Sequence, residues 1–293
     1  MGKKLDPMDK LWQAAELNRR ELIASGAITG IVAGFAAAVQ PVMAQTMIMT
    51  EPKGLEAGMV EIPVGVEKIQ AYRAIQSGAK AQPLILVVQE IFGVHEHIKD
   101  VCRRLALLGY CAIAPEMYQR QGDVGKLTDM DAIRKIVGAV PDKQVMGDLD
   151  AAVAWATSTG IADANKLGVT GFCWGGRIVW LYTAHNPQVK AGVAWYGRLV
   201  GDKSPNTPAF PVDLASQIKA PVLGLYGGAD AGIPVSTVEQ MRAALGAGTK
   251  SMIHVYSDTP HAFFADYRPS YRKEAAADGW SRCTAWFKAN GIA

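Results

Sequence analysis

One cysteine of this chain stands where its thiol could act as a nucleophile. Cys173 is the third residue of the segment 171–176, which reads GFCWGG. The preceding residues, 166–170, are typical of a short buried strand, and those that follow, 177–182, are typical of the start of a helix. Glycines two positions on either side of a nucleophile let the chain turn sharply from strand to helix. The segment therefore predicts a nucleophile elbow with Cys in place of Ser, at a helix N-terminus whose amide N–H groups favour a thiolate.

Two later segments provide an acid and a base for this thiol. Asp230 follows the apolar run 221–226 and a pair of glycines, and His261 follows the run 252–256. The order nucleophile, acid, histidine is that of α/β-hydrolases and differs from the orders in chymotrypsin and subtilisin. We expect His261 to accept the proton of Cys173 and later to donate it to the leaving group, while Asp230 orients the imidazole.

A carboxylate is also expected at the same edge of the predicted sheet. Glu90 follows the apolar run 83–88. A carboxylate at such a place is costly unless it is hydrogen-bonded or takes part in the chemistry. A second interpretation, a helix-approach cap or a solvated turn residue, remains open. The backbone amides of Ile91 and Trp174 are expected to form an oxyanion hole.

The other metal-binding or redox-active residue types carry weaker signals. His95 and His97 are two positions apart, a spacing that does not place both rings on one helix face, so no metal site is expected there. Cys102, Cys111 and Cys283 are interpreted as small core residues. None of them lies at Cys-x-x-Cys spacing from the elbow cysteine, which disfavours a thiol redox protein.

The elements that must position these residues alternate along the chain. Apolar runs bounded by turn residues predict strands over 83–88, 111–114, 167–170, 189–195, 221–226 and 252–256, after a hairpin of 59–66 and 67–75. Helical periodicity predicts helices around 96–108, 143–158, 175–186, 234–246 and 270–289. This alternation predicts an α/β fold with a mostly parallel sheet and helices on both faces. Segments 118–142 and 198–219 are expected to be loops over the carboxyl edge of the sheet.

Composition limits the class of protein further. The chain has 293 residues, 49% of them hydrophobic, and a net charge of only +3. We interpret residues 45–293 as one domain, because no linker or repeat divides them. The small net charge gives no indication of nucleic-acid binding. The sequence makes no prediction of the oligomeric state.

The N-terminal segment resembles an export signal. Arg19 and Arg20 precede an uncharged run, 22–44, that is rich in Ala and Gly and ends in a small-x-small pattern. We expect residues 1–44 to be a twin-arginine signal peptide that is recognised by the export machinery and cleaved after Ala44. The mature protein is therefore expected in the periplasm. The alternative is an uncleaved N-terminal membrane anchor, since the run is long enough to span a bilayer.

Taken together, the motifs resemble the dienelactone hydrolase family, whose members are also called carboxymethylenebutenolidases. The similarity extends from about Glu61 to the end of the chain, and its motifs are 89–93, 109–118, 171–176, 226–230 and 261–263. The resemblance implies an α/β-hydrolase fold that hydrolyses an enol lactone to a dicarboxylic keto acid without a metal or cofactor. It also implies a triad of Cys173, His261 and Asp230, with Glu90 holding the resting thiol until substrate binds.

The sequence departs from the family pattern where the carboxylate of the substrate would bind. Members that hydrolyse dienelactone have an arginine a few residues after the catalytic histidine, whereas residues 262–265 here read AFFA and the nearest arginine is Arg268. Arg120 and Arg198, which lie in the predicted loops, could bind this carboxylate instead, or could be solvated surface residues. The residues expected to contact the substrate are Tyr118, Arg120, Arg198, Phe263 and Arg268.

Our prediction is therefore a hydrolase of a small ester or lactone with a cysteine nucleophile. The alternative is a non-catalytic periplasmic protein that binds a hydrophobic or acidic ligand on the same fold. The complete set of nucleophile, acid and base in the expected order favours the hydrolase.

Overall fold

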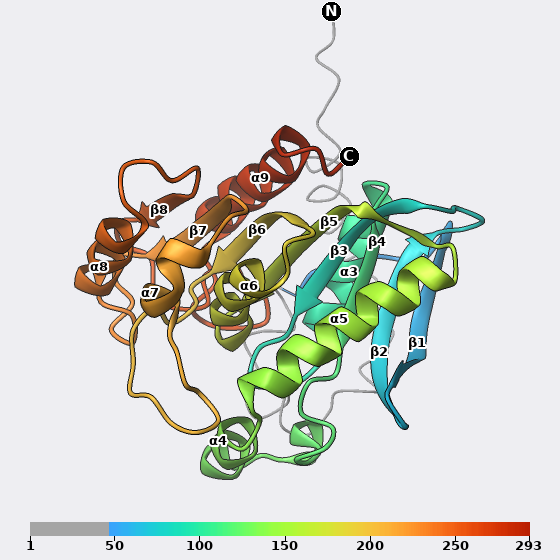
Figure 1. Cartoon of the computed structure of the whole chain (residues 1–293), viewed down its shortest axis with the longest axis horizontal. Coiled ribbons are helices and arrows are strands. Elements are labelled where there is room, and N and C mark those ends of the chain that lie inside the picture. Colours follow the sequence, from blue (N-terminus) through green and yellow to red (C-terminus); the bar gives the residue numbers. More distant parts are fainter. Residues whose placement is uncertain (1–46) are drawn as a thin grey trace, which may run out of the picture.

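Eight strands form one sheet in the order β1-β2-β4-β3-β5-β6-β7-β8 (Figure 1). The computed structural model describes residues 47–293, so the predicted signal peptide 1–44 and the alternative membrane anchor lie outside the described residues. The strands are β1 (Leu55–Val64), β2 (Glu67–Gln76), β3 (Gln82–Val88), β4 (Cys111–Pro115), β5 (Ala162–Phe172), β6 (Val189–Trp195), β7 (Val222–Gly227) and β8 (Met252–Tyr256). The pairs β1–β2 and β2–β4 are antiparallel, and all other pairs are parallel. The predicted leading hairpin and mostly parallel sheet are confirmed.

Helices cover both faces of this sheet. In Figure 1, α5 (Asp142–Ser158) and α6 (Trp174–His185) lie in front of it, and α3 (Glu96–Leu107) and α9 (Lys273–Ala289) lie behind it. A further helix, α8 (Val235–Leu245), connects the last two strands. This arrangement is the α/β-hydrolase fold that the sequence predicts. None of the helices within residues 47–293 is long and apolar enough to cross a membrane.

Both segments predicted to be loops contain helical structure, so those two predictions were wrong in part. Segment 118–142 holds the turn η2 (Val124–Lys126) and the helix α4 (Met130–Gly138). Asp129 caps α4 by accepting hydrogen bonds from the backbone N–H groups of Asp131 and Ala132. Segment 198–219 holds α7 (Pro211–Leu214) and η3 (Ala215–Gln217). These helices are short, and their capping residues are also common in loops. The sequence pattern therefore does not distinguish a short helix from a loop in these two segments.

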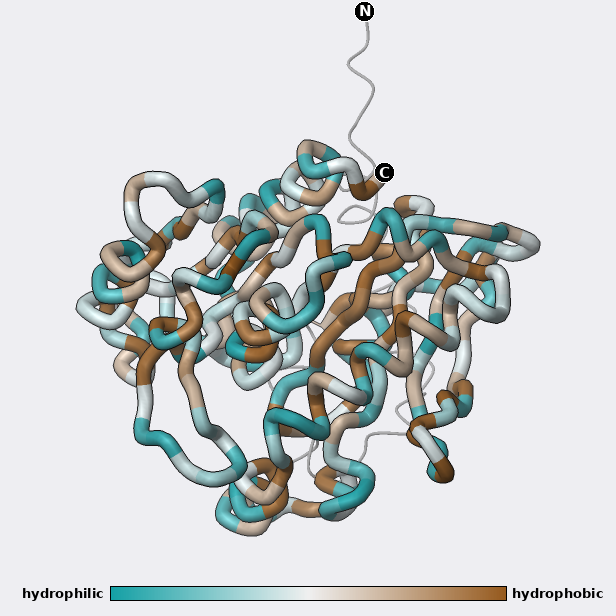
Figure 2. Tube along the Cα trace, in the orientation of Figure 1, coloured by the Kyte–Doolittle hydropathy of each residue, from teal (hydrophilic) through white to brown (hydrophobic). Residues whose placement is uncertain are grey.

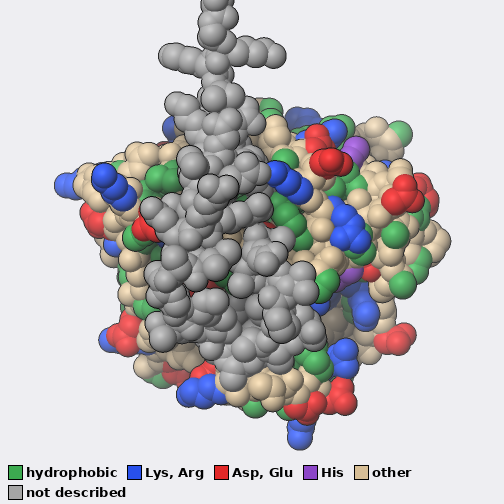
Figure 3. All heavy atoms as spheres, turned by 180° about the vertical axis from the view of Figure 1, so that it is seen from behind, with side chains coloured by type: hydrophobic (Ala, Val, Ile, Leu, Met, Phe, Trp, Pro, Cys, Tyr) green, Lys and Arg blue, Asp and Glu red, His purple; other side chains and the backbone are tan. Residues whose placement is uncertain are grey.

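The core lies along the central strands. Figure 2 shows hydrophobic stretches there, and residues 84–88 of β3 have no exposed surface. Cys102, Cys111 and Cys283 are also fully buried, as predicted. On the part of the molecule visible in Figure 3 outside the grey atoms, acidic and basic side chains are interspersed.

Candidate active site

The elbow is built by the junction of β5 and α6. Cys173 lies between them with φ 55° and ψ −113°, a conformation that non-glycine residues rarely adopt. Its backbone N–H donates to the carbonyl of Trp195 at 3.0 Å. A Cβ on Gly171 would lie 2.4 Å from the carbonyl oxygen of Gly175, and a Cβ on Gly175 would lie 2.3 Å from that of Val88. Only glycine fits at either position, and these contacts fix the strained turn.

The carboxylate of Asp230 holds the imidazole of His261. The Nδ1 atom of His261 is 2.6 Å from Oδ2 of Asp230. The other oxygen, Oδ1, accepts the backbone N–H groups of Gly232 at 2.9 Å and Ile233 at 3.1 Å. Asp230 follows β7 and His261 follows β8, so parallel strands bring both to the edge that carries Cys173.

The protonation of His261 follows from these neighbours. Burial lowers the pKa of His261, but interactions with Asp230 and Cys173 outweigh it and raise the pKa to about 10. The imidazole is therefore protonated at neutral pH and lies next to the thiol. The thiolate is the form in which cysteine is a strong nucleophile, and a neighbouring imidazolium is a suitable partner for it.

Glu90 is a buried anion at the same edge. Burial raises the pKa of Glu90, but the opposing effects of His95, Arg268 and His97 together outweigh burial and lower the pKa to about 2. Its Oε2 atom accepts the hydroxyl of Tyr267 and lies 3.3 Å from Nε2 of His95. The resemblance implied that this carboxylate holds the resting thiol. The structure instead binds Oε2 to Tyr267, and Oε1 has no hydrogen-bond partner within residues 47–293.

The backbone amides of Ile91 and Trp174 are not used by other parts of the described chain. Within residues 47–293, neither N–H donates to a protein acceptor. The carbonyl of Glu90 accepts the hydroxyl of Tyr118 at 3.1 Å. Because N–H and C=O point in opposite directions in a trans peptide, this bond also fixes the direction of the Ile91 N–H. The hydroxyl of Tyr118, expected to contact substrate, thus orients the backbone.

The two loop arginines lie in different surroundings. Arg120 donates both terminal nitrogens to Asp148, at 2.7 and 3.0 Å, and its Nε to Glu67 at 2.6 Å. A bidentate pair of this kind leaves the guanidinium no free donor face, so the expectation that Arg120 binds a substrate carboxylate is corrected to a structural role. Arg198 is exposed at the surface.

Phe263 lies in the core. It has no exposed surface and packs against Tyr196, Tyr256 and Trp195, with ring centroids 5.3, 5.1 and 6.0 Å away. The structure therefore gives this ring a packing role in the core, which corrects the expectation that it contacts substrate.

Arg268 remains as a cation at the site. Its guanidinium lies 5.7 Å from the centre of the Phe92 ring and is close enough to Glu90 and Cys173 to interact with their charges. Burial lowers the pKa of Arg268, but these anions raise it above its usual value. Within residues 47–293 it forms no ion pair at 4.0 Å or less, so its donors are available to a ligand.

Sequence reasoning missed two tyrosines at the site. Tyr196 is fully buried, has φ 38°, and its ring lies 5.1 Å from that of His261. Its hydroxyl has no hydrogen-bond partner within the described chain. Its place directly after the strand β6 was a usable signal, since strand ends carry the site. Tyr267 had no local signal.

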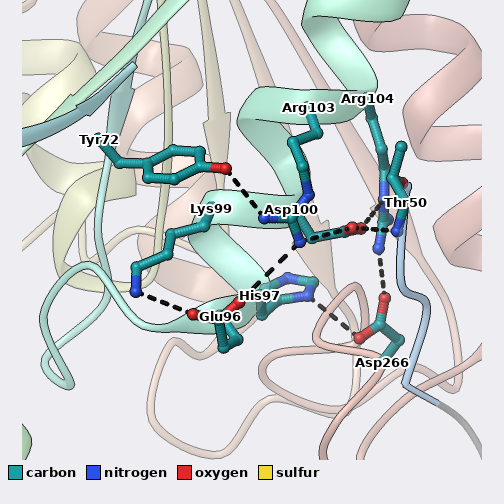
Figure 4. Close-up of polar contacts among 9 residues, drawn as sticks. All are labelled: Thr50, Tyr72, Glu96, His97, Lys99, Asp100, Arg103, Arg104 and Asp266. Carbon is teal, nitrogen blue, oxygen red and sulfur yellow. Dashed lines mark hydrogen bonds and ion pairs between the residues drawn. The ribbon is translucent and has the colours of Figure 1, made fainter. Parts of the chain in front are cut away.

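A buried polar network fixes the segment that carries His261 and Tyr267 (Figure 4). Asp266 lies 3.1 Å from Nδ1 of His97 and accepts a hydrogen bond from Arg104 at 2.7 Å. Arg104 also donates to Asp100 at 2.6 Å. Asp266 thus anchors its segment to α3 and does not orient His261. Within residues 47–293, no group of three or more His, Cys, Asp or Glu side chains is arranged to hold a metal ion.

Comparisons with known proteins agree on one family. The family model described as the dienelactone hydrolase family matches residues 69–291. A relative from Methylorubrum extorquens, named as a carboxymethylenebutenolidase, is 61% identical over 279 residues, which cover 94% of each chain. A relative from Bradyrhizobium sp, named as a 2-oxo-3-(5-oxofuran-2-ylidene)propanoate lactonase, is 30% identical and covers 76% of this chain and 90% of its own. A crystal structure of a dienelactone hydrolase from Klebsiella pneumoniae superimposes with a TM-score of 0.78 at 56% identity and covers 80% of this chain and 98% of its own. All three names are inferred assignments.

Proposed function

Because this chain belongs to the dienelactone hydrolase family, we propose that it hydrolyses a small ester or enol lactone with Cys173 as nucleophile, His261 as acid and base, and Asp230 as the orienting acid. The observation that carries this proposal is the position of His261. Asp230 binds one side of its imidazole, and Asp230 and Cys173 together raise the pKa of His261. Cys173 itself lies on a strained elbow. A strongly shifted pKa beside a specific charge partner is typical of functional sites.

The chemistry follows from these positions. The thiolate of Cys173 attacks the carbonyl carbon, and the carbonyl electron pair moves to oxygen, where the N–H groups of Ile91 and Trp174 stabilise it. Each such donor contributes on the order of 3 kcal/mol to transition-state stabilisation. The C–O bond then breaks, His261 protonates the leaving oxygen, and a thioester remains. Water then attacks the thioester carbonyl while neutral His261 takes its proton, and the C–S bond breaks, which releases the acid and restores the Cys173 thiolate beside protonated His261.

The proposed substrate carries a carboxylate beside the lactone. The Bradyrhizobium relative is named for a furanone that bears a propanoate group. In this chain, Arg268 is a cation at the site without an ion-pair partner in the described chain, and the buried hydroxyl of Tyr196 is an unused donor. A guanidinium and a hydroxyl are suitable partners for a carboxylate.

Acid quenching during turnover tests the proposal. Mass spectrometry of the quenched protein should show an acyl adduct on the peptide that contains Cys173, and Cys173→Ala should show none. An adduct elsewhere, or turnover without an adduct in both proteins, would contradict it. A ligand that raises Tm without any hydrolysis would favour the non-catalytic binding protein.

The place of action is a second part of the proposal. The twin-arginine pattern before residue 45 supports export of a folded protein to the periplasm. N-terminal sequencing of the protein from the periplasmic fraction should begin at Gln45. An intact N-terminus in the membrane fraction would support the uncleaved anchor.

A further inference from the structure

Two chain segments extend beyond the carboxyl edge of the sheet and begin on different sides of the proposed site. Residues 118–141 follow β4, and residues 198–210 follow β6. The first segment begins at Tyr118, whose ring lies 5.0 Å from that of Trp174, the residue after the nucleophile. The second begins shortly after Tyr196, whose ring packs against the catalytic histidine. One segment therefore starts beside the nucleophile and the other beside the base.

The far ends of the two segments lie against each other. The side-chain amide of Asn206 donates to the carbonyl of Gly138, the last residue of α4, at 3.1 Å. The backbone N–H of Asp142, the first residue of α5, donates to the carbonyl of Asn206 at 2.8 Å. In Figure 1, α4 and the loop between β6 and α7 lie next to each other beyond the same end of the sheet. The two segments thus form a continuous rim from one side of the site to the other.

The side chain of Arg177 binds both ends of this rim at once. Its two terminal nitrogens donate to the two carboxylate oxygens of Asp142, each at 2.7 Å, and Nη2 also donates to the carbonyl of Ala209 at 2.6 Å. The guanidinium lies 4.9 Å from the centre of the Phe210 ring, within the range of a cation–π contact. Arg177 and Asp142 are both buried, and a bidentate pair of this kind is geometrically specific.

The backbone of the same arginine is fixed to the nucleophile elbow. The N–H of Arg177 donates to the carbonyl of Cys173 at 3.3 Å, in the first turn of α6. A Cβ on Gly197 would lie 2.3 Å from the backbone nitrogen of Arg177, so the chain that leads into the second segment packs directly on this turn. The helix that carries the nucleophile therefore also holds the rim, and the two segments cannot separate without losing the contacts of Arg177.

We propose that Arg177 is a positioning residue that joins the two segments into a fixed rim, so that the site admits compact acyl groups and excludes long ones. A planar guanidinium can bind a carboxylate with two nitrogens while it also bonds a carbonyl and stacks on a ring, whereas the ammonium of lysine is a point charge that cannot keep this geometry. When this contact is weakened, the segments can move apart and longer acyl chains can enter. The inference concerns the substrate class of the site and rests on the proposed function.

The test compares the hydrolysis of two p-nitrophenyl esters, the acetate and the octanoate, which differ only in the length of the acyl chain. Arg177→Lys keeps the charge but loses the bidentate geometry. The ratio of kcat/KM for the octanoate to that for the acetate should therefore rise by about tenfold, on the scale at which pockets discriminate methylene groups. A merely structural defect would lower both values and leave their ratio unchanged. Arg73→Lys is the matched control, because Arg73 pairs with Glu56 on the hairpin of β1 and β2, and it should keep the wild-type ratio.

A milder variant keeps the test decisive if Arg177→Lys does not fold. Asn206→Ala removes only the side-chain bond between the second segment and Gly138, and it should raise the same ratio by a smaller factor. A wild-type ratio in folded Arg177→Lys would overturn the inference. If Arg177→Lys does not fold, a wild-type ratio in Asn206→Ala would overturn it.

Thiol alkylation decides the inference in a protein that hydrolyses neither ester. Such a protein would contradict the proposed function, but Cys173 is partly exposed and can still react. The rates of its alkylation by iodoacetamide and by the bulky 5-iodoacetamidofluorescein, with the modified residue identified by mass spectrometry, report the width of the site without turnover. Arg177→Lys should raise the rate with the bulky reagent relative to that with the small one, and an unchanged ratio of the two rates would overturn the inference.

Discussion

The 2.6 Å contact between Nδ1 of His261 and Oδ2 of Asp230 fixes which nitrogen of the imidazole is left for chemistry. Asp230 cannot rotate freely, since two backbone N–H groups bind its other oxygen. With Nδ1 occupied, Nε2 is the nitrogen that can exchange protons with Cys173 and with the leaving group. The pair therefore sets both the position and the basicity of the general base.

Asp230→Asn should lower kcat/KM by about 10⁴-fold, because the amide favours the wrong tautomer of His261. It should also shift the pH profile. The pKa of His261 is raised to about 10, so wild-type activity should persist until deprotonation of the imidazolium near that pH removes the proton donor. Without the carboxylate, this alkaline limb should move to lower pH. A profile of kcat/KM against pH with an unmoved limb would contradict the role of Asp230.

Tyr118→Phe should lower kcat by about tenfold and leave KM nearly unchanged. The variant frees the carbonyl of Glu90, so the Ile91 N–H that follows it loses its fixed direction toward the oxyanion. Steady-state kinetics with an activated ester measures both constants. A rise in KM at constant kcat would instead return Tyr118 to the substrate-binding role that the sequence suggested.

Arg268→Gln should raise KM for a lactone that carries a carboxylate by about tenfold, the effect of losing a hydrogen bond between charged groups. The same variant should leave KM for a neutral ester unchanged. Arg134→Gln is the matched control, since Arg134 is exposed on α4, pairs with Asp131 and should affect neither substrate. Equal effects of Arg268→Gln on both substrates would indicate that the guanidinium does not bind a carboxylate.

Asp266→Asn should destabilise the fold by about 3 kcal/mol, because it leaves Arg104 buried without one of its two carboxylates. Urea denaturation measures this change in the free energy of unfolding. Asp131→Asn removes an exposed pair with Arg134 and should change the same free energy by less than about 1 kcal/mol. Equal effects of the two variants would contradict a central role for the buried network.

The sequence predicts the parts of this site that local patterns encode. Cys173 lies in a glycine-framed motif, and Asp230 and His261 each follow an apolar strand, so strand ends and chain order together suggest their meeting. The partner of Tyr267 is 177 positions away in the sequence, and no periodicity links them. Likewise, Arg120 looked available because its partner Asp148 lies on another element, where only the folded chain reveals the pairing.

The central claim is that one thiol, that of Cys173, performs the hydrolysis. The most direct measurement compares initial rates of enol-lactone hydrolysis by Cys173→Ala, Cys102→Ala and Cys283→Ala. The two buried cysteines have no exposed surface, so their variants should retain activity once folded, as circular dichroism would verify. The account predicts that only Cys173→Ala loses hydrolysis. Similar losses in all three folded variants, or retained hydrolysis in Cys173→Ala, would contradict it.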